Sequence, residues 1–214
     1  MHNVHWCGAG HRDDHQKGVA VAEHLPDGES RNLRILAERM RSRRTTNMFL
    51  KQDVSRQLVL DAIELARWAP NHHLTEPWHF YVLGDEKKAA SAELIRTIVT
   101  ENKTAEIGEH KFKSAMSVPG WLVVTCRKSD DELRGREDYA SCCCAVQNIL
   151  LYLSEAGVAS KWTTGLITRD SRFFELLDID DSKEYVVGLV WYGYPKILPT
   201  QSRKDVGEIL TETD

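Results

Sequence analysis

A long helical stretch, predicted from about Glu137 to Ala156, constrains the fold of this chain more than any other feature. Apolar residues recur around almost its whole circumference: Ala140, Cys143, Ala145, Val146, Ile149, Leu150 and Leu153. A helix without a polar face has to be surrounded by other elements. Gly157 follows it, as is typical where a helix ends. The sequence therefore predicts one core in which this helix is the central and most buried element.

Other segments alternate between helical and extended patterns. Helices are predicted from Asn32, from Ser55 as N-cap, and at 173–177. The charged stretch from Asp85 to about Lys113 fits one or two helices, or an excursion that covers a ligand or faces a partner. Three strands are predicted, at 78–83, 121–126 and 185–192, and the second is apolar enough to be buried on both faces. This interleaving favours one domain of the α/β or α+β class around a single sheet.

Composition and charge narrow the range of partners. The 214 residues are 42% hydrophobic and 28% charged, an ordinary balance for a globular protein. The formal net charge of -4 provides no positive field for nucleic acid or for an anionic membrane, so neither is expected as a partner. No apolar run approaches the roughly 20 residues of a membrane-spanning helix, and the amino terminus lacks the pattern of a signal peptide. The expected compartment is therefore the cytoplasm.

Residues 1–28 differ from the rest of the chain. Five of the nine histidines lie there, at positions 2, 5, 11, 15 and 24, without hydrophobic periodicity. The spacing of His11 and His15 would allow a transition metal to bind if the segment were helical, but a solvated tail fits the composition better. We therefore expect a flexible, histidine-rich extension at 1–28 and one folded domain at 29–214.

The run Arg43-Arg44-Thr45-Thr46 follows the first predicted helix. Two guanidinium groups and two hydroxyls can converge there on an anion such as a phosphate. The same arginines would also complement the carboxyl end of a helix. The sequence leaves both interpretations open.

The loop from Ala69 to Trp78 is stiffened by two prolines, so it could position a planar ligand or could simply join two elements. A zinc site at His72 and His73 is not expected, because adjacent side chains usually point apart and no third ligand is suitably spaced.

Several features of enzyme chemistry are missing or are better explained by packing. Consecutive helical side chains point about 100° apart, so Cys142, Cys143 and Cys144 cannot bind one ion and are interpreted as packing thiols. The five cysteines form no disulfide framework. The chain has no phosphate-binding loop, no dinucleotide fingerprint and no serine nucleophile elbow. Nucleotide hydrolysis and serine hydrolysis therefore have no support.

Three blocks, in this order, resemble the nitroreductase family of flavin mononucleotide (FMN) enzymes, especially its shorter members with a Pro-Asp/Asn-His loop. The first block is Arg43-Arg44-Thr45. The second runs from Pro70-Asn71-His72 to Pro77-Trp78-His79-Phe80. The third block consists of the long helix that contains Gln147-Asn148, then Trp162-Thr163-Thr164-Gly165, and then the segment 188–195. The resemblance spans about residues 39–205.

The resemblance implies an α+β fold with a central, mostly antiparallel sheet, flanked by helices and completed by homodimerisation. It also implies FMN at the subunit interface, NADH or NADPH as hydride donor, and a nitroaromatic, a quinone or a similar small molecule as electron acceptor. The implied cofactor-binding residues are Arg43, Arg44, Thr45, Pro70, Asn71, His72, Trp162, Thr163, Thr164, Gly165 and Arg203. The flavin N5, beside the backbone of Thr164 and Gly165, would carry the chemistry, so no catalytic side chain and no metal ligand is implied.

In the implied site, His72 would reach the flavin held by the other subunit. Two departures from the family pattern fall nearby: Asn47 stands where a basic residue is common, and Glu76 replaces the glutamine before Pro-Trp. The alternatives are a flavin-binding or storage module without turnover, and a reductive dehalogenase or flavin-modifying enzyme on the same scaffold. A third alternative is a phosphate-recognising interaction protein.

Overall fold

The computed structural model of this chain describes residues 27–213. Its contacts divide the chain into two compact units, Met1–Glu38 and Arg39–Asp214, each of which is described by itself. Helix α1 (Asp27–Ser42) begins five residues before the helix predicted from Asn32. Positions 1–26 of the predicted extension, with His11 and His15, lie outside the described residues. The boundary at residue 28 stays a prediction.

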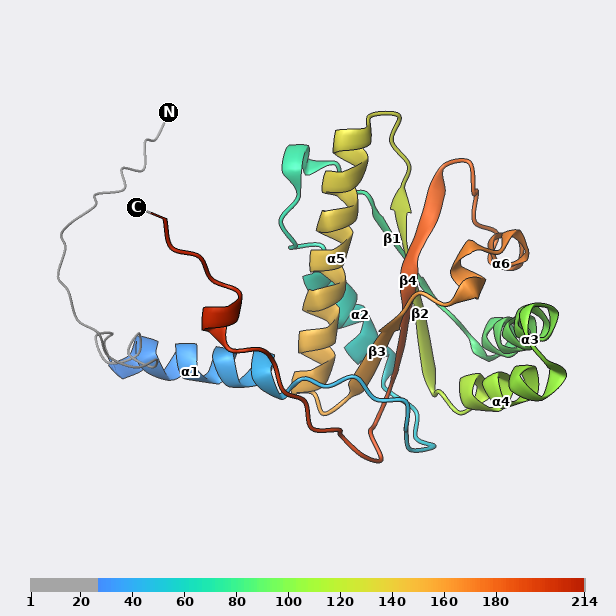
Figure 1. Cartoon of the computed structure of the whole chain (residues 1–214), viewed down its shortest axis with the longest axis horizontal. Helices are drawn as coiled ribbons and strands as arrows, with labels where there is room; N and C mark the ends of the chain where they lie inside the picture. Colours follow the sequence, from blue (N-terminus) through green and yellow to red (C-terminus); the bar gives the residue numbers. More distant parts are fainter. Residues whose placement is uncertain (1–26, 214) are drawn as a thin grey trace. The chain divides into compact units, whose positions relative to one another are not determined.

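The second unit is built on one four-stranded antiparallel sheet (Figure 1). The strands lie in the order β1 (Trp78–Val82), β2 (Gly120–Arg127), β4 (Glu184–Gly193) and β3 (Ala159–Thr163). The three predicted strands are confirmed. The fourth, β3, has the sequence Ala-Ser-Lys-Trp-Thr, which lacks the apolar alternation of a strand. Its pairing with β4 compensates for this weak local signal, since tertiary context routinely overrides propensity.

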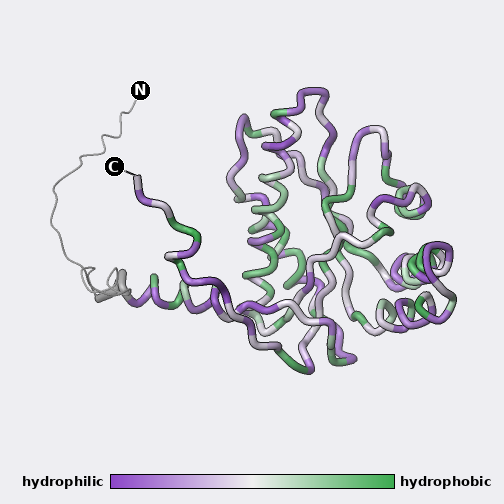
Figure 2. Tube along the Cα trace, viewed as in Figure 1, coloured by the Kyte–Doolittle hydropathy of each residue, from purple (hydrophilic) through white to green (hydrophobic). Residues whose placement is uncertain are grey.

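Helices cover both faces of the sheet, so β2 is buried on both sides, as its sequence predicts. Leu122 and Val124 point into a core that is shared with α2 (Arg56–Ala66) and α5 (Glu132–Glu155). Trp121 and Val123 point into a second core on the other face, formed with α3 (Asp85–Asn102), α4 (Ala105–Met116) and α6 (Ser171–Leu176). Figure 2 shows hydrophobic segments in α5 and in the strands against which it packs. The fold is thus an α+β sandwich with one sheet between two helical layers.

Helix α5 is central, but the prediction of burial all round is wrong. The helix begins at Glu132, one turn earlier than expected, because the Asp131 side chain accepts a hydrogen bond from the Arg134 N–H at 2.8 Å and caps it. Ile149 lies fully in the core, whereas Ala140 and Cys144 are exposed. The periodicity of the sequence identified the apolar positions of the helix, but it did not show which of them other elements of the same chain bury. Within residues 27–213, nothing covers the stripe through Ala140 and Cys144.

The charged stretch after β1 forms two helices, α3 and α4, which pack on each other and on the sheet face opposite α5. Ala92, Ile98 and Ala115 provide their buried contacts. In the part of the chain that the structure describes, no helix is both long and apolar enough to cross a membrane.

Gly188 in β4 leaves room for the Trp162 indole of the neighbouring strand. A β-carbon at this position would lie 2.7 Å from Cδ1 of that indole and 3.1 Å from the Thr163 carbonyl oxygen. We therefore expect Gly188→Ala to lower the free energy of unfolding by about 1–3 kcal/mol, the usual cost of overpacking. In the control Gly135→Ala, on α5, the nearest atom lies at 3.9 Å. This control should be about 0.5–1 kcal/mol more stable than the wild type, because alanine favours helix. Urea unfolding measures both, and equal stabilities would contradict the packing described.

Candidate functional site

The segment after α1 is fixed along one edge of the sheet. Thr45 forms a β-bridge with Ser160 of β3, and Phe49 forms one with Pro195, just beyond β4. The Thr46 hydroxyl donates a hydrogen bond to the Ile197 carbonyl at 3.1 Å and accepts one from the Met48 N–H at 3.1 Å. This edge therefore brings residues 43–49 together with the chain that leaves β4.

Three arginines surround this edge, and they have different partners. The Arg44 guanidinium donates to the carbonyls of Arg41 and Arg43, so it complements the carboxyl end of α1. Burial lowers the pKa of Arg43, and the charges of Arg203 and Arg44 lower it further. Within residues 27–213, no carboxylate pairs with Arg43 or Arg203. Crowded cations without an acidic partner among the described residues are a candidate site for an anion.

A cavity of about 440 Å³ lies between this edge, α3 and α4. One wall of the cavity is apolar and contains Ile98, Leu189 and Trp191. Asn47 and Lys161 also line it, and the Lys161 ammonium donates a hydrogen bond to the Asn47 side-chain oxygen at 2.8 Å. Its Nζ atom lies 5.5 Å from the centre of the Trp191 ring. The cavity thus combines a flat aromatic wall with a fixed cation.

Lys161 is a candidate site residue that the sequence analysis missed. Burial, followed by the charge of Lys111, lowers the pKa of this lysine. It lies beside Asn47, so a cation is present although position 47 is not basic. Only the strand period places Lys161 and Thr163 on one face and Trp162 on the other, and the residues of β3 do not themselves predict a strand.

Thr163 and Gly165 line the same cavity. The Gly165 carbonyl accepts hydrogen bonds from the N–H and the hydroxyl of Thr168, at 3.0 and 2.9 Å. Its own N–H has no partner among the described residues, and the space beside its α-carbon is open. Thr164 is exposed between them. A backbone donor is therefore available among the residues that line the cavity.

Trp162 does not line the cavity together with Thr163 and Gly165. Its indole packs against Gly188 in the core shared with α5, on the opposite face of the sheet from the cavity. Its Nε1 atom is buried and has no hydrogen-bond partner among the described residues. The structure thus separates Trp162 from Thr163 and Gly165.

The loop between α2 and β1 is tied to α5. The Asn71 amide donates to the Ser141 hydroxyl at 3.2 Å, and the Thr75 hydroxyl donates to the carboxylate of Asp138, which is buried. The Glu76 N–H donates to the Asn71 side-chain oxygen at 2.7 Å, while Pro70 and Glu76 are exposed. We call residues 69–77 the α2–β1 loop.

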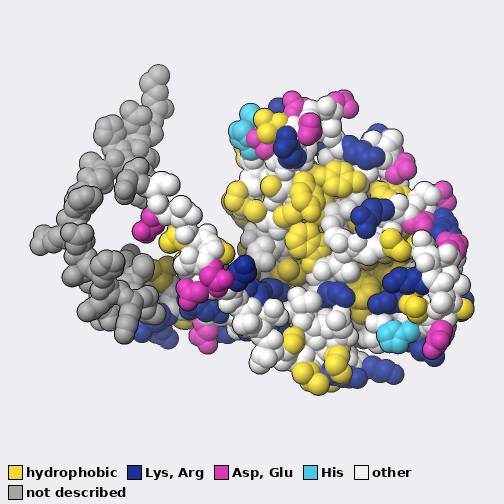
Figure 3. Space-filling model, viewed as in Figure 1, with side chains coloured by type: hydrophobic (Ala, Val, Ile, Leu, Met, Phe, Trp, Pro, Cys, Tyr) yellow, Lys and Arg dark blue, Asp and Glu magenta, His cyan; other side chains and the backbone are white. Residues whose placement is uncertain are grey.

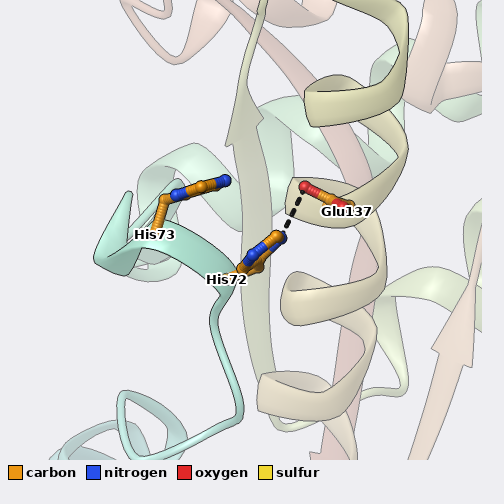
Figure 4. A group of neighbouring side chains, drawn as sticks. All are labelled: His72, His73 and Glu137. Carbon is orange, nitrogen blue, oxygen red and sulfur yellow. Dashed lines mark ion pairs between the residues drawn. The ribbon is translucent and has the colours of Figure 1, made fainter.

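Within this loop, His72 and His73 lie side by side beside Glu137 of α5 (Figure 4). Their ring centres are 3.8 Å apart, and His72 Nδ1 lies 3.0 Å from a Glu137 carboxylate oxygen. Both premises of the sequence argument against a metal site here are wrong. The rings do not point apart, because His73 has a φ of 61°, in the left-handed region, and the third donor comes from a distant helix.

The α2–β1 loop and the arginine edge lie at opposite ends of α5. Glu137 contacts His72, whereas Glu155, near the other end, pairs with Arg39 at 2.5 Å. A rise of 1.5 Å per residue places these two glutamates about 27 Å apart. One chain therefore does not bring His72 and Arg43 to the same small molecule.

Of the consecutive cysteines, Cys142 packs in the core and Cys143 is half-buried, whereas Cys144 is exposed, so the prediction of a packing thiol is wrong for Cys144 in the single chain. Cys142 is fully buried, and its hydrogen bond with Cys126, together with burial, raises its pKa well above the usual range. Burial also raises the pKa of Cys143. Reactive cysteines typically have a lowered pKa, so the raised pKa of these two thiols disfavours the nucleophilic thiolate at neutral pH.

These features define an α+β protein with clustered arginines and an aromatic-walled cavity at the edge of its sheet. Residues 40–194 match the Nitroreductase family, and the chain belongs to this family.

Named relatives agree with this assignment. The Bacillus subtilis (strain 168) protein called "Putative NAD(P)H nitroreductase YfhC" is 30% identical over 185 residues, which cover 83% of this chain and 94% of that protein. The solved nitroreductase-like family protein from Bacillus cereus is 26% identical, with a TM-score of 0.75 over 84% of this chain and 96% of its own. Iodotyrosine deiodinase, solved with FMN and 3-iodo-L-tyrosine, has the same fold. It is 21% identical, with a TM-score of 0.65 over 84% of this chain and 98% of its own.

Proposed function

We propose that this protein is an FMN-dependent oxidoreductase that takes hydride from NADH or NADPH and reduces nitroaromatic, quinone or similar small acceptors. The observation that carries the proposal is the crowding of Arg43 and Arg203, without a carboxylate partner among the described residues, on the same segment whose Asn47 lines the cavity. This arrangement suits a ligand with an anionic end and a flat aromatic end. Membership of the Nitroreductase family, and the names of its relatives, support FMN and NAD(P)H as the molecules concerned.

Each part of the site has a distinct task in this proposal. Arg43 and Arg203 hold the phosphate, because a guanidinium group can donate two parallel hydrogen bonds to it. Thr45 contributes its hydroxyl to the ribityl chain, and Arg44 orients the segment through its bonds to the end of α1.

The flat end of the ligand lies in the cavity. Thr163 and Lys161 line its wall, and the backbone near Thr164 and Gly165 offers a donor to the flavin N5. When bound, FMN supplies the hydride-accepting atom, and the protein supplies position and hydrogen bonds. Trp162 supports this wall from behind, through its packing on Gly188.

A homodimer completes the site in this proposal. His72, with Pro70 and Asn71, lies about 27 Å along α5 from the arginine edge, too far for one FMN to reach both. If the α2–β1 loop also contacts flavin, it must contact the flavin of a second copy. The uncovered stripe of α5 suits a two-fold interface. Figure 3 shows hydrophobic side chains gathered over this helix.

The absorption spectrum of the purified, untagged protein tests the proposal. We expect yellow flavin bands that bleach when NADH or NADPH is added under anaerobic conditions and return when a quinone or nitroaromatic is added. Bands that never bleach would indicate a flavin-binding module without turnover. A colourless protein that cannot be reconstituted with FMN would refute the proposal.

One specific observation favours a second function on the same scaffold. Iodotyrosine deiodinase shares the fold and was solved with an iodinated amino acid. Reductive dehalogenation would use the same FMN site, so release of halide from a halogenated phenol, in the same anaerobic assay, distinguishes the two functions.

A further inference from the structure

His72, His73 and Glu137 form a compact set of donors, of which the proposed function uses only His72, as a contact to the flavin of a second copy. One imidazole nitrogen from each histidine and one carboxylate oxygen all lie within 4.8 Å of one another (Figure 4). The closest pair, His72 Nδ1 and the Glu137 oxygen, is 3.0 Å apart. Two donors on one zinc or nickel ion, with bonds of about 2.0–2.1 Å, lie roughly 3.0–3.4 Å apart. One edge of a coordination site therefore already has the required length.

The other two edges can close by side-chain rotation. His72 is 62% exposed, and the Glu137 side chain is 32% exposed, so both have room to turn toward a common point. Imidazole lone pairs lie in the plane of the ring, so the stacked rings must rotate out of their stack to face one ion, and the exposure of both histidines leaves room for this rotation. The adjustment required is local and does not disturb the core.

The backbone of the loop holds the two histidines against α5. Hydrogen bonds on either side of the pair, from Asn71 to Ser141 and from Thr75 to Asp138, fix the loop to the same helix that carries Glu137. A donor set that is anchored on both sides by its neighbours is preorganised for a ligand.

The conformation of the loop is also unusual. His73, Leu74 and Glu76 have φ values of 61°, 50° and 45°, in the left-handed region that residues with a β-carbon rarely adopt. Such a conformation persists only where the surroundings impose it. In this loop, its consequence is that His73 is turned onto the ring of His72.

We propose that His72, His73 and Glu137 bind one divalent transition-metal ion of the zinc, nickel or cobalt class. Two imidazole nitrogens and one carboxylate oxygen suit these ions, whereas magnesium and calcium prefer oxygen donors alone. Three protein ligands leave at least one coordination position for water or another ligand. The ion would link the α2–β1 loop to α5, so binding would stabilise the folded chain.

Zinc binding to the full-length protein tests this proposal by comparison of variants. Residues 1–26 contain five histidines and Cys7, so total zinc content alone is not informative. Isothermal titration with zinc chloride should show one site that is lost, or weakened at least tenfold, in both Glu137→Gln and His73→Asn. Asparagine tolerates the left-handed φ at position 73, and glutamine keeps the shape of Glu137, so both variants should fold.

Matched controls keep the test specific. Glu132→Gln removes an exposed carboxylate from the same helix, and His79→Ala removes an exposed histidine from β1. Both should bind zinc like the wild type. Cobalt(II) gives a second readout: its visible absorption bands should lose intensity in Glu137→Gln, and zinc should raise the melting temperature of the wild type more than that of this variant.

The proposal is overturned if Glu137→Gln and His73→Asn bind zinc with the stoichiometry and affinity of the wild type. Neither residue is assigned to the flavin, so this failure would leave the proposed function intact. Conversely, a protein without flavin that still loses a zinc site in these variants would support the metal site alone.

Discussion

Replacing Arg43 with alanine is expected to weaken FMN binding about 10- to 100-fold, because a hydrogen-bonded pair between a guanidinium and a phosphate contributes about 1.5–3 kcal/mol. The fold should remain stable. Burial and two neighbouring arginines lower the pKa of Arg43, so its charge is held unfavourably in the free protein, and its removal relieves repulsion. Quenching of FMN fluorescence by the flavin-free protein measures the affinity, and thermal unfolding measures the fold.

Two further variants make this result specific. Arg43→Lys keeps the charge but loses the planar fork, so its affinity should lie between those of Arg43→Ala and the wild type. Arg67→Ala removes an exposed arginine at the carboxyl end of α2, which pairs with Glu64 at 2.9 Å. This variant should bind FMN normally. Unchanged affinity in Arg43→Ala would remove this residue from the site and would favour another location for the phosphate.

The fold could be predicted from the sequence wherever a segment has its own periodicity. The strand around Trp121 and the helix around Ile149 carry enough apolar residues to identify themselves, and both are confirmed. Strand β3 could not be identified in this way, since its five residues become a strand through pairing with β4. Because this strand was not predicted, Lys161 was also missed, since only the alternation of a strand shows that Lys161 shares a face with Thr163.

The candidate site could be predicted in part, and the reason lies in distances along the chain. Residues 43–45 are contiguous, so their pattern alone offers an anion site, beside the second interpretation that the arginines complement the end of a helix. Glu137 follows His72 by more than sixty positions, and no local pattern links them. The turn that stacks His73 on His72 depends on a left-handed φ at a residue other than glycine, which local propensity does not indicate.

Sequence periodicity also cannot distinguish a helix face buried by its own chain from a face buried by a second copy. Both require apolar or small residues at helical spacing. Ala140 was predicted as part of the core, and it is exposed in the single chain, as is Cys144 one turn further along α5. The homodimer proposal reconciles these two facts, because the stripe would be buried in the dimer.

Introducing an arginine into this stripe, as Cys144→Arg, should therefore dissociate the dimer and reduce flavin occupancy together. At a two-fold interface each substitution occurs twice, and like charges placed opposite each other cost several kcal/mol. The dimer dissociation constant should rise about 100-fold or more. The monomer should still fold, since Cys144 is exposed and contributes nothing to the core. Light scattering after gel filtration measures the mass, and the absorbance of bound flavin measures occupancy.

The control for this experiment places the same charge on another helix. Thr97→Arg, at an exposed position of α3, should remain dimeric and keep its flavin. A wild-type protein that is monomeric yet retains FMN would contradict the dimer proposal. A Cys144→Arg variant that stays dimeric would move the interface away from α5. Joint loss of dimer and flavin, with circular dichroism unchanged, is the result that the 27 Å separation of the two half-sites along α5 requires, because neither half would then hold the cofactor with its counterpart.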